Sequence, residues 1–314
     1  MSAAVTARAP AKVNLVLKVG DPRPDGFHEL ATVFAAVGLE EQVSVADGPA
    51  GVRVTVDGEG ARRVPTGPAN LAARAVRALA DVTGIDLSIR GVDVAIRKRV
   101  PVAAGLAGGS ADAAATLVAL DALWGTALDG ERLRVLAAGL GSDVPFGLVG
   151  GTAVGTGRGH LLAPVVGPGN YSWVLAFAAG ELSTPRVFAE LDRMRAAAPG
   201  GDPAVGAPGP GAPTVSPVLL DALRTGDAPA VGELLDNDLQ APALSLMPSL
   251  RACLQVGSER GALGAVVSGS GPTCAFLAAD SGHGADLAAA LTAAGVCRAA
   301  VSVPGPVTGA SLLA

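Results

Sequence analysis

The glycine-rich run at residues 101–112, PVAAGLAGGSAD, joins a predicted strand around residues 92–96 to a long helical pattern. A loop of this kind presents unpaired backbone N–H groups and the positive end of a helix dipole, and both favour an anion. Its glycines would let a phosphate approach the backbone closely. The run has neither the Gly-Lys-Ser/Thr ending of a Walker A loop nor a G-x-G-x-x-G pattern. It therefore predicts a phosphate-binding loop of another kind, with a tight turn of small residues as the alternative.

Residues 11–19 alternate between apolar and polar side chains, as a half-buried strand does. On this pattern Lys12 and Asn14 point to the same face of the strand. Lysine occurs at only three positions, Lys12, Lys18 and Lys98, against 20 arginines. A compact ammonium binds differently from a planar guanidinium, so a lysine in such a background indicates a place where a point charge is needed. Lys12 and Lys98 are therefore candidates for a functional site.

Two further segments combine small residues with polar side chains. Asp143, in the segment GSDVPF, would accept the proton of a substrate hydroxyl, and an Asx turn or helix cap is the alternative. The segment SGSGPT at residues 268–273 would form a backbone nest around phosphate oxygens, and a hairpin turn is the alternative. Together with Lys12 and the glycine-rich run, these segments predict a cleft between two domains.

Strand and helix patterns are mixed without regular β-α-β alternation, which favours the α+β class over a doubly wound parallel sheet. Further strands are predicted around residues 43–45, 52–56 and 173–177, and helices around 70–84, 110–124, 131–140, 186–198, 216–224, 229–236, 247–260 and 284–294. A length of 314 residues exceeds one usual core. A Pro/Gly-rich joint at 164–170 divides the chain into predicted domains 1–166 and 167–314. Residues 199–216, rich in Pro, Gly and Ala, predict a flexible surface loop.

Composition and charge exclude several classes of function. A net charge of −5 gives no electrostatic footprint for nucleic acid. No apolar stretch is long enough for a membrane span and no signal-peptide pattern is present, so a cytoplasmic protein is expected. The three cysteines lack a C-x-x-C spacing and are expected to be reduced core residues, and the three histidines form no metal-binding pair. A serine hydrolase is disfavoured because no G-x-S-x-G elbow has matching partners.

The chain resembles, nearly from end to end, the superfamily of galactokinase, homoserine kinase, mevalonate kinase and phosphomevalonate kinase (GHMP kinases). The resemblance rests on PAKVNL at residues 10–15, RPDGFHEL at 23–30, GLAGGSADA at 105–113 and GSDVPF at 141–146. It implies an N-terminal domain like that of ribosomal protein S5, a C-terminal ferredoxin-like α/β sandwich and an active site between them. The RPDGFH segment resembles that of one branch of the superfamily. Enzymes of this branch use ATP to phosphorylate the 2-hydroxyl of a cytidyl-diphosphate ester of methylerythritol in non-mevalonate isoprenoid synthesis.

By this resemblance Asp143 would accept the proton of the attacking hydroxyl, and Lys12 would hold both groups in place. ATP would bind, with Mg²⁺ for which no ligand residue is assigned, to Pro101, Val102, Ala103, Ala104, Gly105, Leu106, Ala107, Gly108, Gly109, Ser110 and Ala111, with Asn70 and Lys98 near adenine. The other substrate would contact Asn14, Phe27, His28, Thr184, Phe188, Gly269, Ser270 and Gly271. Phe27 and Phe188 would sandwich the cytosine ring while His28 bonds its edge, although a core position on an amphipathic helix is the alternative for Phe188.

Two positions depart from the superfamily pattern. Ala107 stands where glycine is usual, and we expect a negative φ there because a positive φ would cost an alanine energy. Phe27 replaces the commoner tyrosine and keeps the ring. The rival hypotheses are another GHMP kinase, such as homoserine or mevalonate kinase, a non-catalytic ligand sensor on the same fold, and an RNA-binding module, which the acidic charge disfavours. A monomer or homodimer with small-molecule substrates and no membrane or nucleic-acid partner is expected.

Overall fold

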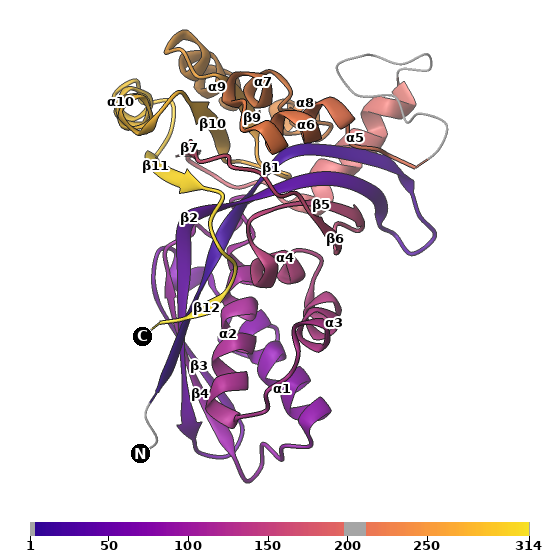
Figure 1. Ribbon diagram of the computed structural model, residues 1–314, viewed down its shortest axis with the longest axis vertical. Coiled ribbons are helices and arrows are strands. Elements are labelled where there is room, and N and C mark those ends of the chain that lie inside the picture. Colours follow the sequence, from indigo (N-terminus) through magenta and orange to yellow (C-terminus); the bar gives the residue numbers. More distant parts are fainter. Residues whose placement is uncertain (1–3, 198–211, 314) are drawn as a thin grey trace.

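The computed structural model describes residues 4–197 and 212–313 of the chain, so most of the predicted loop 199–216 lies outside the described residues. Figure 1 shows a larger sheet in the lower part of the molecule with helices on one side, and a smaller sheet with its helices above. Helices and strands follow one another irregularly, which confirms the predicted α+β class. No helix in the described part is long and apolar enough to cross a membrane.

The described elements differ from the predicted ones mainly in their ends. The lower part holds β1 (Val5–Pro22), β2 (His28–Gly48), β3 (Val52–Gly58), the 3-10 helix η1 (Ala61–Arg63), α1 (Leu71–Thr83), β4 (Gly91–Lys98), α2 (Gly108–Trp124), α3 (Gly130–Leu140), α4 (Val144–Val149), β5 (Thr152–Gly157), β6 (Leu161–Pro164) and β12 (Ser311–Leu312). The upper part holds β7 (Tyr171–Phe177), α5 (Thr184–Ala197), α6 (Pro217–Thr225), α7 (Ala228–Glu233), β8 (Asp236–Asn237), α8 (Gln240–Leu246), α9 (Leu250–Glu259), β9 (Gly264–Val267), β10 (Cys274–Ala278), α10 (Ser281–Ala293) and β11 (Ala299–Gly305). The short elements η1, α4, α8, β5, β6, β8, β11 and β12 were not predicted.

The larger sheet has the order β12-β1-β2-β4-β3, with β5 beside β2, β6 beside β5 and β8 beside β1. Strands β3 and β4 are parallel, and so are β1 and β8, whereas the other pairs are antiparallel. Helix α2 packs against β1 and β2 and against α1, and most of its residues are buried. The sheet therefore holds the start of α2, where the glycine-rich run ends, at its centre.

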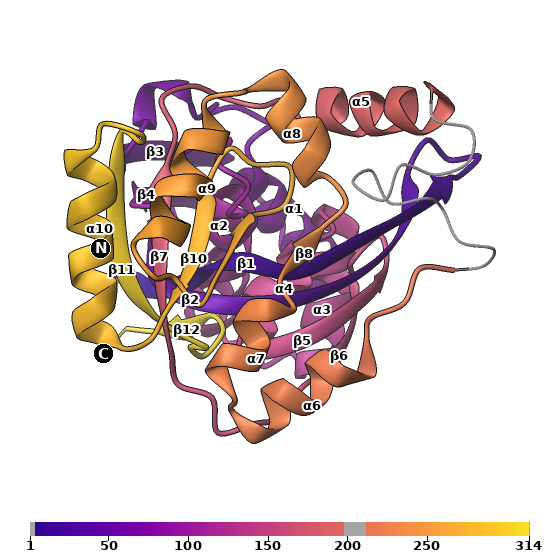
Figure 2. The same ribbon diagram turned by 90° about the horizontal axis from the view of Figure 1, so that it is seen from above.

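Strand β1 is buried on both faces, so the prediction of a half-buried strand at residues 11–19 was wrong. One face, with Val13 and Leu15, packs into the apolar cluster that contains Trp173 and Leu175 of the second sheet. The opposite face carries Lys12 and Asn14, which are also buried. Both faces are covered because the long β1–β2 ribbon runs between the two parts of the molecule, as Figure 2 shows. Alternation along a strand separates two faces, but it does not say that one of them meets water.

The second sheet is antiparallel throughout, with the order β11-β7-β10-β9. Its apolar clusters include residues of β1 on one side and residues of α5, α9 and α10 on the other. The turn between β9 and β10 is the predicted strand–turn–strand around residues 268–273. This turn consequently faces β1 and the glycine-rich run.

The last described residues return to the first sheet, although the predicted boundary at 166/167 assigns them to the second domain. For the remaining residues this boundary stays a prediction. Leu312 of β12 pairs with Ala7 of β1. Just before it, the backbone N–H of Ala310 donates to the carbonyl of Gly147 in α4 at 2.8 Å, and Gly151 donates to the carbonyl of Val307 at 2.7 Å. Residues 307–310 thereby form a strap over the end of α4.

Candidate active site

A cavity of about 710 Å³ lies where β1, β2, the loop between β4 and α2, and the second sheet's β9–β10 turn meet. We call residues 99–107, between β4 and α2, the phosphate loop. The predicted site residues that line the cavity are Lys12, Asn14, Phe27, His28, Ala103, Ala104, Gly105, Ala107, Gly108, Gly109, Ser110, Asp143, Thr184, Phe188, Gly269 and Ser270. Segments that are far apart in sequence are therefore brought to one cleft.

Lys12 projects from β1 into this cleft and is fixed by the loop in front of it. Its Nζ donates to Oδ1 of Asn14 at 2.6 Å and to the carbonyl oxygen of Gly105 at 2.9 Å, and it lies 4.0 Å from Oδ2 of Asp143. Only 6% of the residue is exposed. Burial lowers the pKa of Lys12 below its usual value, while the nearby Asp143 carboxylate acts in the opposite direction.

Asn14 is held in turn by a chain of hydrogen bonds. Its Nδ2 donates to Oγ1 of Thr32 at 2.8 Å, and this hydroxyl donates to the carbonyl of Val16 at 2.6 Å. A register shift between β1 and β2 at residues 14–16 aims these groups into the cleft. Sequence reasoning missed Thr32, because an isolated buried threonine in a strand gives no functional signal.

Asp143 occupies the position just before α4. It has helical backbone angles, and its side chain makes no capping hydrogen bond to α4. The carboxylate is about one-third exposed and faces Lys12 across the cavity. The predicted alternative, that Asp143 is only a helix cap, is therefore wrong.

The phosphate loop curls tightly because three of its residues adopt positive φ. These are Ala103 at 55°, Gly105 at 75° and Ala107 at 58°. The expectation of a negative φ at Ala107 was wrong: the residue caps α2 in the left-handed region, where an alanine costs about 1 kcal/mol more than glycine. The left-handed conformation at Ala107 lets the backbone change direction between the phosphate loop and α2. Ser110, which follows in the first turn of α2, does not cap it.

The β9–β10 turn meets the phosphate loop from the other side of the cleft. The hydroxyl of Ser268 donates to the carbonyl of Gly105 at 3.1 Å, the same oxygen that Lys12 binds. A Cβ on Gly105 would come within 2.2 Å of the Ser268 carbonyl, so only glycine fits. Nδ2 of Asn237, which sequence reasoning missed, donates to the carbonyl of Gly269 at 2.7 Å. Gly271 stands outside the lining of the cavity.

Several aromatic residues line the cavity. Phe27 is 49% exposed, and the guanidinium of Arg158 lies 4.9 Å from its ring centroid. The rings of His28 and Phe188 are 5.0 Å apart, and Nε2 of His28 is 3.0 Å from Oδ1 of Asp192. Phe188 lines the cavity and also packs against the apolar cluster of the second sheet, so the alternative of a core position is confirmed while stacking on cytosine stays a prediction. Sequence reasoning missed Arg158 and Asp192, whose neighbours in sequence carry no motif.

Two predicted ATP-binding side chains point elsewhere. Asn70 caps α1: its Oδ1 accepts from the backbone of Ala72 and Ala73, and its Nδ2 donates to the carbonyl of Pro65. Lys98 is buried in an ionic cluster. Neither lines the cavity, and Leu106 and Ala111 are buried in the interior. A contact of these residues with ATP stays a prediction.

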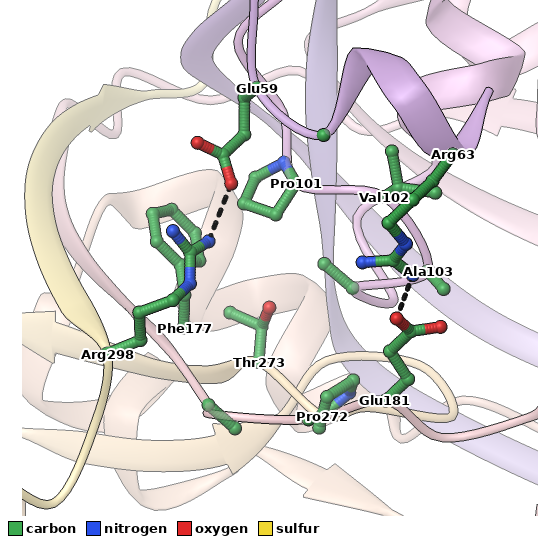
Figure 3. Close-up of a pocket in the computed structure, with 14 residues that line it drawn as sticks. Glu59, Arg63, Pro101, Val102, Ala103, Phe177, Glu181, Pro272, Thr273 and Arg298 are labelled. Carbon is green, nitrogen blue, oxygen red and sulfur yellow. Dashed lines mark ion pairs between the residues drawn. The ribbon is translucent and has the colours of Figure 1, made fainter.

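A second cavity, of about 280 Å³, shares Ala103 and Ala104 with the first and also contacts Pro101 and Val102. Figure 3 shows an ion pair on each side of it. Glu59 binds Arg298 at 2.9 Å, and Arg63 binds Glu181. Both pairs link the part that carries the phosphate loop to the part that carries the second sheet. They hold the outer edges of the cleft together.

Comparison with known proteins agrees with this arrangement. The family model for the GHMP kinases N terminal domain matches residues 70–151, and that for the GHMP kinases C terminal matches residues 219–297. A 4-diphosphocytidyl-2-C-methyl-D-erythritol kinase from Rhodococcus jostii is 53% identical over 98% of this chain and 95% of that protein. The enzyme of the same name from Streptomyces coelicolor is 49% identical over 98% of this chain and 99% of that protein.

Solved structures give the same result. A crystal structure of 4-(cytidine 5'-diphospho)-2C-methyl-D-erythritol kinase, 33% identical, superposes with a TM-score of 0.76 over 96% of this chain and 99% of that one. Mevalonate kinase from L. major, at 17% identity and a TM-score of 0.75 over 96% of each chain, shares the fold. The cleft, its phosphate loop and these likenesses lead to one conclusion: the chain belongs to the 4-diphosphocytidyl-2-C-methyl-D-erythritol kinases of the GHMP superfamily, and it is an ATP-dependent small-molecule kinase.

Proposed function

We propose that this kinase transfers the γ-phosphoryl group of ATP to the 2-hydroxyl of 4-diphosphocytidyl-2-C-methyl-D-erythritol. The observation that carries the proposal is the Lys12–Asp143 pair, 4.0 Å apart, in a cavity lined by both the phosphate loop and aromatic residues. A kinase of this kind needs three things in one cleft: a polyphosphate cradle, a group that receives the hydroxyl proton, and a holder for the second substrate. The cavity contains a candidate for each.

In this mechanism ATP lies with its phosphates along the phosphate loop and the first turn of α2. The N–H groups there and the helix dipole would stabilise the negative charge. Mg²⁺ bound with ATP would neutralise part of that charge, and we assign no residue as its ligand. In the described residues no group of three or more His, Cys, Asp or Glu side chains could hold a metal ion.

Asp143 would accept the proton of the 2-hydroxyl as its oxygen attacks the γ-phosphorus in line with the departing ADP. Lys12 would favour both the ionised carboxylate and the oxygen on which negative charge develops. Two of the three N–H donors of the Lys12 ammonium bind Oδ1 of Asn14 and the carbonyl oxygen of Gly105, which leaves one donor for the reacting groups. Positioning and electrostatics would supply most of the rate acceleration.

Phe27 and Phe188 would hold the cytosine ring between them, because both line the cavity. A pyrimidine gains stacking energy from flat partners, and only six phenylalanines occur in the chain. His28, fixed by Asp192, would bond the edge of the base, and Thr184 and Ser270 would bond the diphosphate or the alcohol. We further propose a cytoplasmic enzyme that acts as a monomer or homodimer.

The experiment that tests this function compares phosphorylation of 4-diphosphocytidyl-2-C-methyl-D-erythritol, homoserine and mevalonate, with ADP release as the rate and phosphorus NMR to locate the new phosphate. The cytidyl substrate should be the best acceptor and should carry the phosphate at its 2-position. Faster turnover of an alcohol without cytidine would refute the substrate. Unchanged phosphorylation by an Asp143→Ala variant would refute the mechanism.

A further inference from the structure

Glu41, in β2, is completely buried at the base of the phosphate loop. Its Oε2 accepts a hydrogen bond from the backbone N–H of Arg99 at 2.8 Å, where the loop leaves β4. A Cβ built on Gly108, the first residue of α2, would lie 3.0 Å from Oε1 of Glu41. The carboxylate therefore binds one end of the phosphate loop directly and lies close to the other, although it is outside the cavity lining.

An ionic cluster extends this connection into α2. Oε1 of Glu41 forms an ion pair with Lys98, the last residue of β4, and Nζ of Lys98 donates to Oδ2 of Asp112 at 2.8 Å. Lys98 and Asp112 are 4% and 3% exposed. Charges in such an interior position tolerate little displacement, because separating them from their partners is costly. The cluster thus fixes the end of β4 and the start of α2 relative to β2.

The charge of the cluster also bears on an anion above it. Two carboxylates share one ammonium, so full ionisation would leave one net negative charge near the polyphosphate. Burial, followed by the charge of Asp112, raises the pKa of Glu41 to about 7, and burial raises the pKa of Asp112. Protonation of Glu41 below neutral pH therefore removes this net negative charge.

We propose that Glu41 is a positioning residue for ATP: by binding the start of the phosphate loop directly and the start of α2 through Lys98 and Asp112, it sets how the loop's backbone N–H groups face the phosphates. Glu41 acts through the backbone of Arg99 and through Lys98, and it does not touch ATP. The inference rests on the proposed function to the extent that the phosphate loop is taken to bind ATP. No sequence pattern indicates this role of Glu41, since an acidic residue in the middle of a strand ordinarily marks a solvated face.

The test is the dissociation constant of ATP, measured calorimetrically on the whole protein for Glu41→Ala and Glu41→Gln. Glu40→Gln is the matched control, because Glu40 is the adjacent residue and binds only Arg8 among the described ion pairs. Glu41→Ala should weaken ATP binding about tenfold, as removal of groups that support a binding loop commonly does. Affinity for the cytidyl substrate should stay within about twofold of wild type, and Glu40→Gln should change neither constant.

A merely structural role would lower thermal stability and weaken both ligands alike, and that result would overturn the proposal. So would an unchanged ATP constant in a folded Glu41→Ala variant. If Glu41→Ala does not fold, Glu41→Gln decides. As the pH rises from 6 to 8, the affinity of wild type for ATP should fall relative to that of Glu41→Gln. ATP ionises in the same way with both proteins, so its own ionisation cancels in this comparison. Equal pH profiles of ATP affinity would refute the role of Glu41. Wild-type protein that binds ATP but does not phosphorylate the cytidyl substrate would instead refute the proposed function.

Discussion

The ammonium of Lys12 donates a 2.9 Å hydrogen bond to the carbonyl oxygen of Gly105, so the first strand of the chain is joined to the phosphate loop within the cleft. Because Ser268 of the second part binds the same oxygen, this one carbonyl connects three segments that are distant in sequence. The position of Lys12 relative to the phosphates therefore does not depend on β1 alone. A shift of the β9–β10 turn would move the loop against Lys12.

Removing either member of the Lys12–Asp143 pair should reduce kcat far more than it reduces substrate binding. Asp143→Asn and Lys12→Met should each lower kcat by about 10²- to 10⁴-fold, because proton acceptance and charge stabilisation act mainly in the transition state. Lys18→Met is the matched control, since Lys18 in the same strand binds Asp236 and Asp238 outside the cavity. Steady-state kinetics with ATP and the cytidyl substrate measure the effect. A variant of the pair that keeps wild-type kcat would contradict the assigned roles.

Loss of the Phe27 or Phe188 ring from the cavity lining should affect one substrate only. Phe27→Leu and Phe188→Leu should each raise KM for the cytidyl substrate by about fivefold or more, since stacking of a base on an aromatic ring contributes about 1–3 kcal/mol. KM for ATP should be unchanged. Phe27→Tyr keeps the ring and should behave as wild type. Parallel rises in both KM values would show that the residues support the fold of the cleft and do not hold cytosine.

Replacement of Ala107 by glycine should stabilise the protein. Alanine at a φ of 58° is strained by about 1 kcal/mol, which exceeds the entropy that glycine loses on folding by a few tenths of a kcal/mol. Ala107→Gly should raise Tm by about 1 °C, whereas Ala78→Gly in the interior of α1 should lower Tm because glycine disfavours a helix there. Differential scanning calorimetry of the two variants checks both signs. A lower Tm for Ala107→Gly would mean that the left-handed conformation is not strained.

The ionisation of Glu41 should make stability depend on pH. Its pKa is 4.5 in an unfolded chain and about 7 in the folded protein, so the folded state holds the proton more tightly. Below pH 4.5 the Glu41 carboxyl is protonated in both the folded and the unfolded state. Its contribution to the free energy of unfolding is lost as the pH rises from about 4.5 to about 7. The free energy of unfolding should fall over this window more steeply in wild type than in Glu41→Gln. Urea denaturation at pH 5 and pH 7.5 measures the difference, and parallel slopes in the two proteins would contradict the raised pKa.

Local patterns predicted much of the fold and the cleft. The helix after Asn70 and the loop–helix unit at residues 101–124 follow from capping and glycine placement, which act over a few residues. Lys12 and Asp143 were chosen as candidates from residue type and motif, and the structure brings them to 4.0 Å. Their meeting depends on packing between β1 and α4, which no local pattern encodes. Resemblance to known kinases supplied that link.

Other features depend on tertiary packing and were not predictable from the sequence. Lys98 forms its ion pairs with Glu41 and Asp112 only when three elements of the fold meet. The resemblance to known kinases implied a role for Lys98 near adenine, but no local pattern indicated these ion pairs. The left-handed conformation of Ala107 is imposed by the turn into α2 and runs against the preference of alanine. Double-sided burial of β1 arises because a second sheet packs on it.

The strap over α4 has a consequence for the order in which the enzyme is made. Residue 310 hydrogen-bonds to the helix that follows Asp143, and residue 312 pairs with residue 7 at the edge of the first sheet. During translation the ribosome releases the segment around residue 143 long before it releases residues 307–312. A nascent chain therefore exposes an unpaired stretch of β1 and an unsupported α4 until residues 307–312 have emerged. The proposed base would reach its working position only after that point, so translation products that end before residue 307 would be catalytically silent even when most of both sheets had formed.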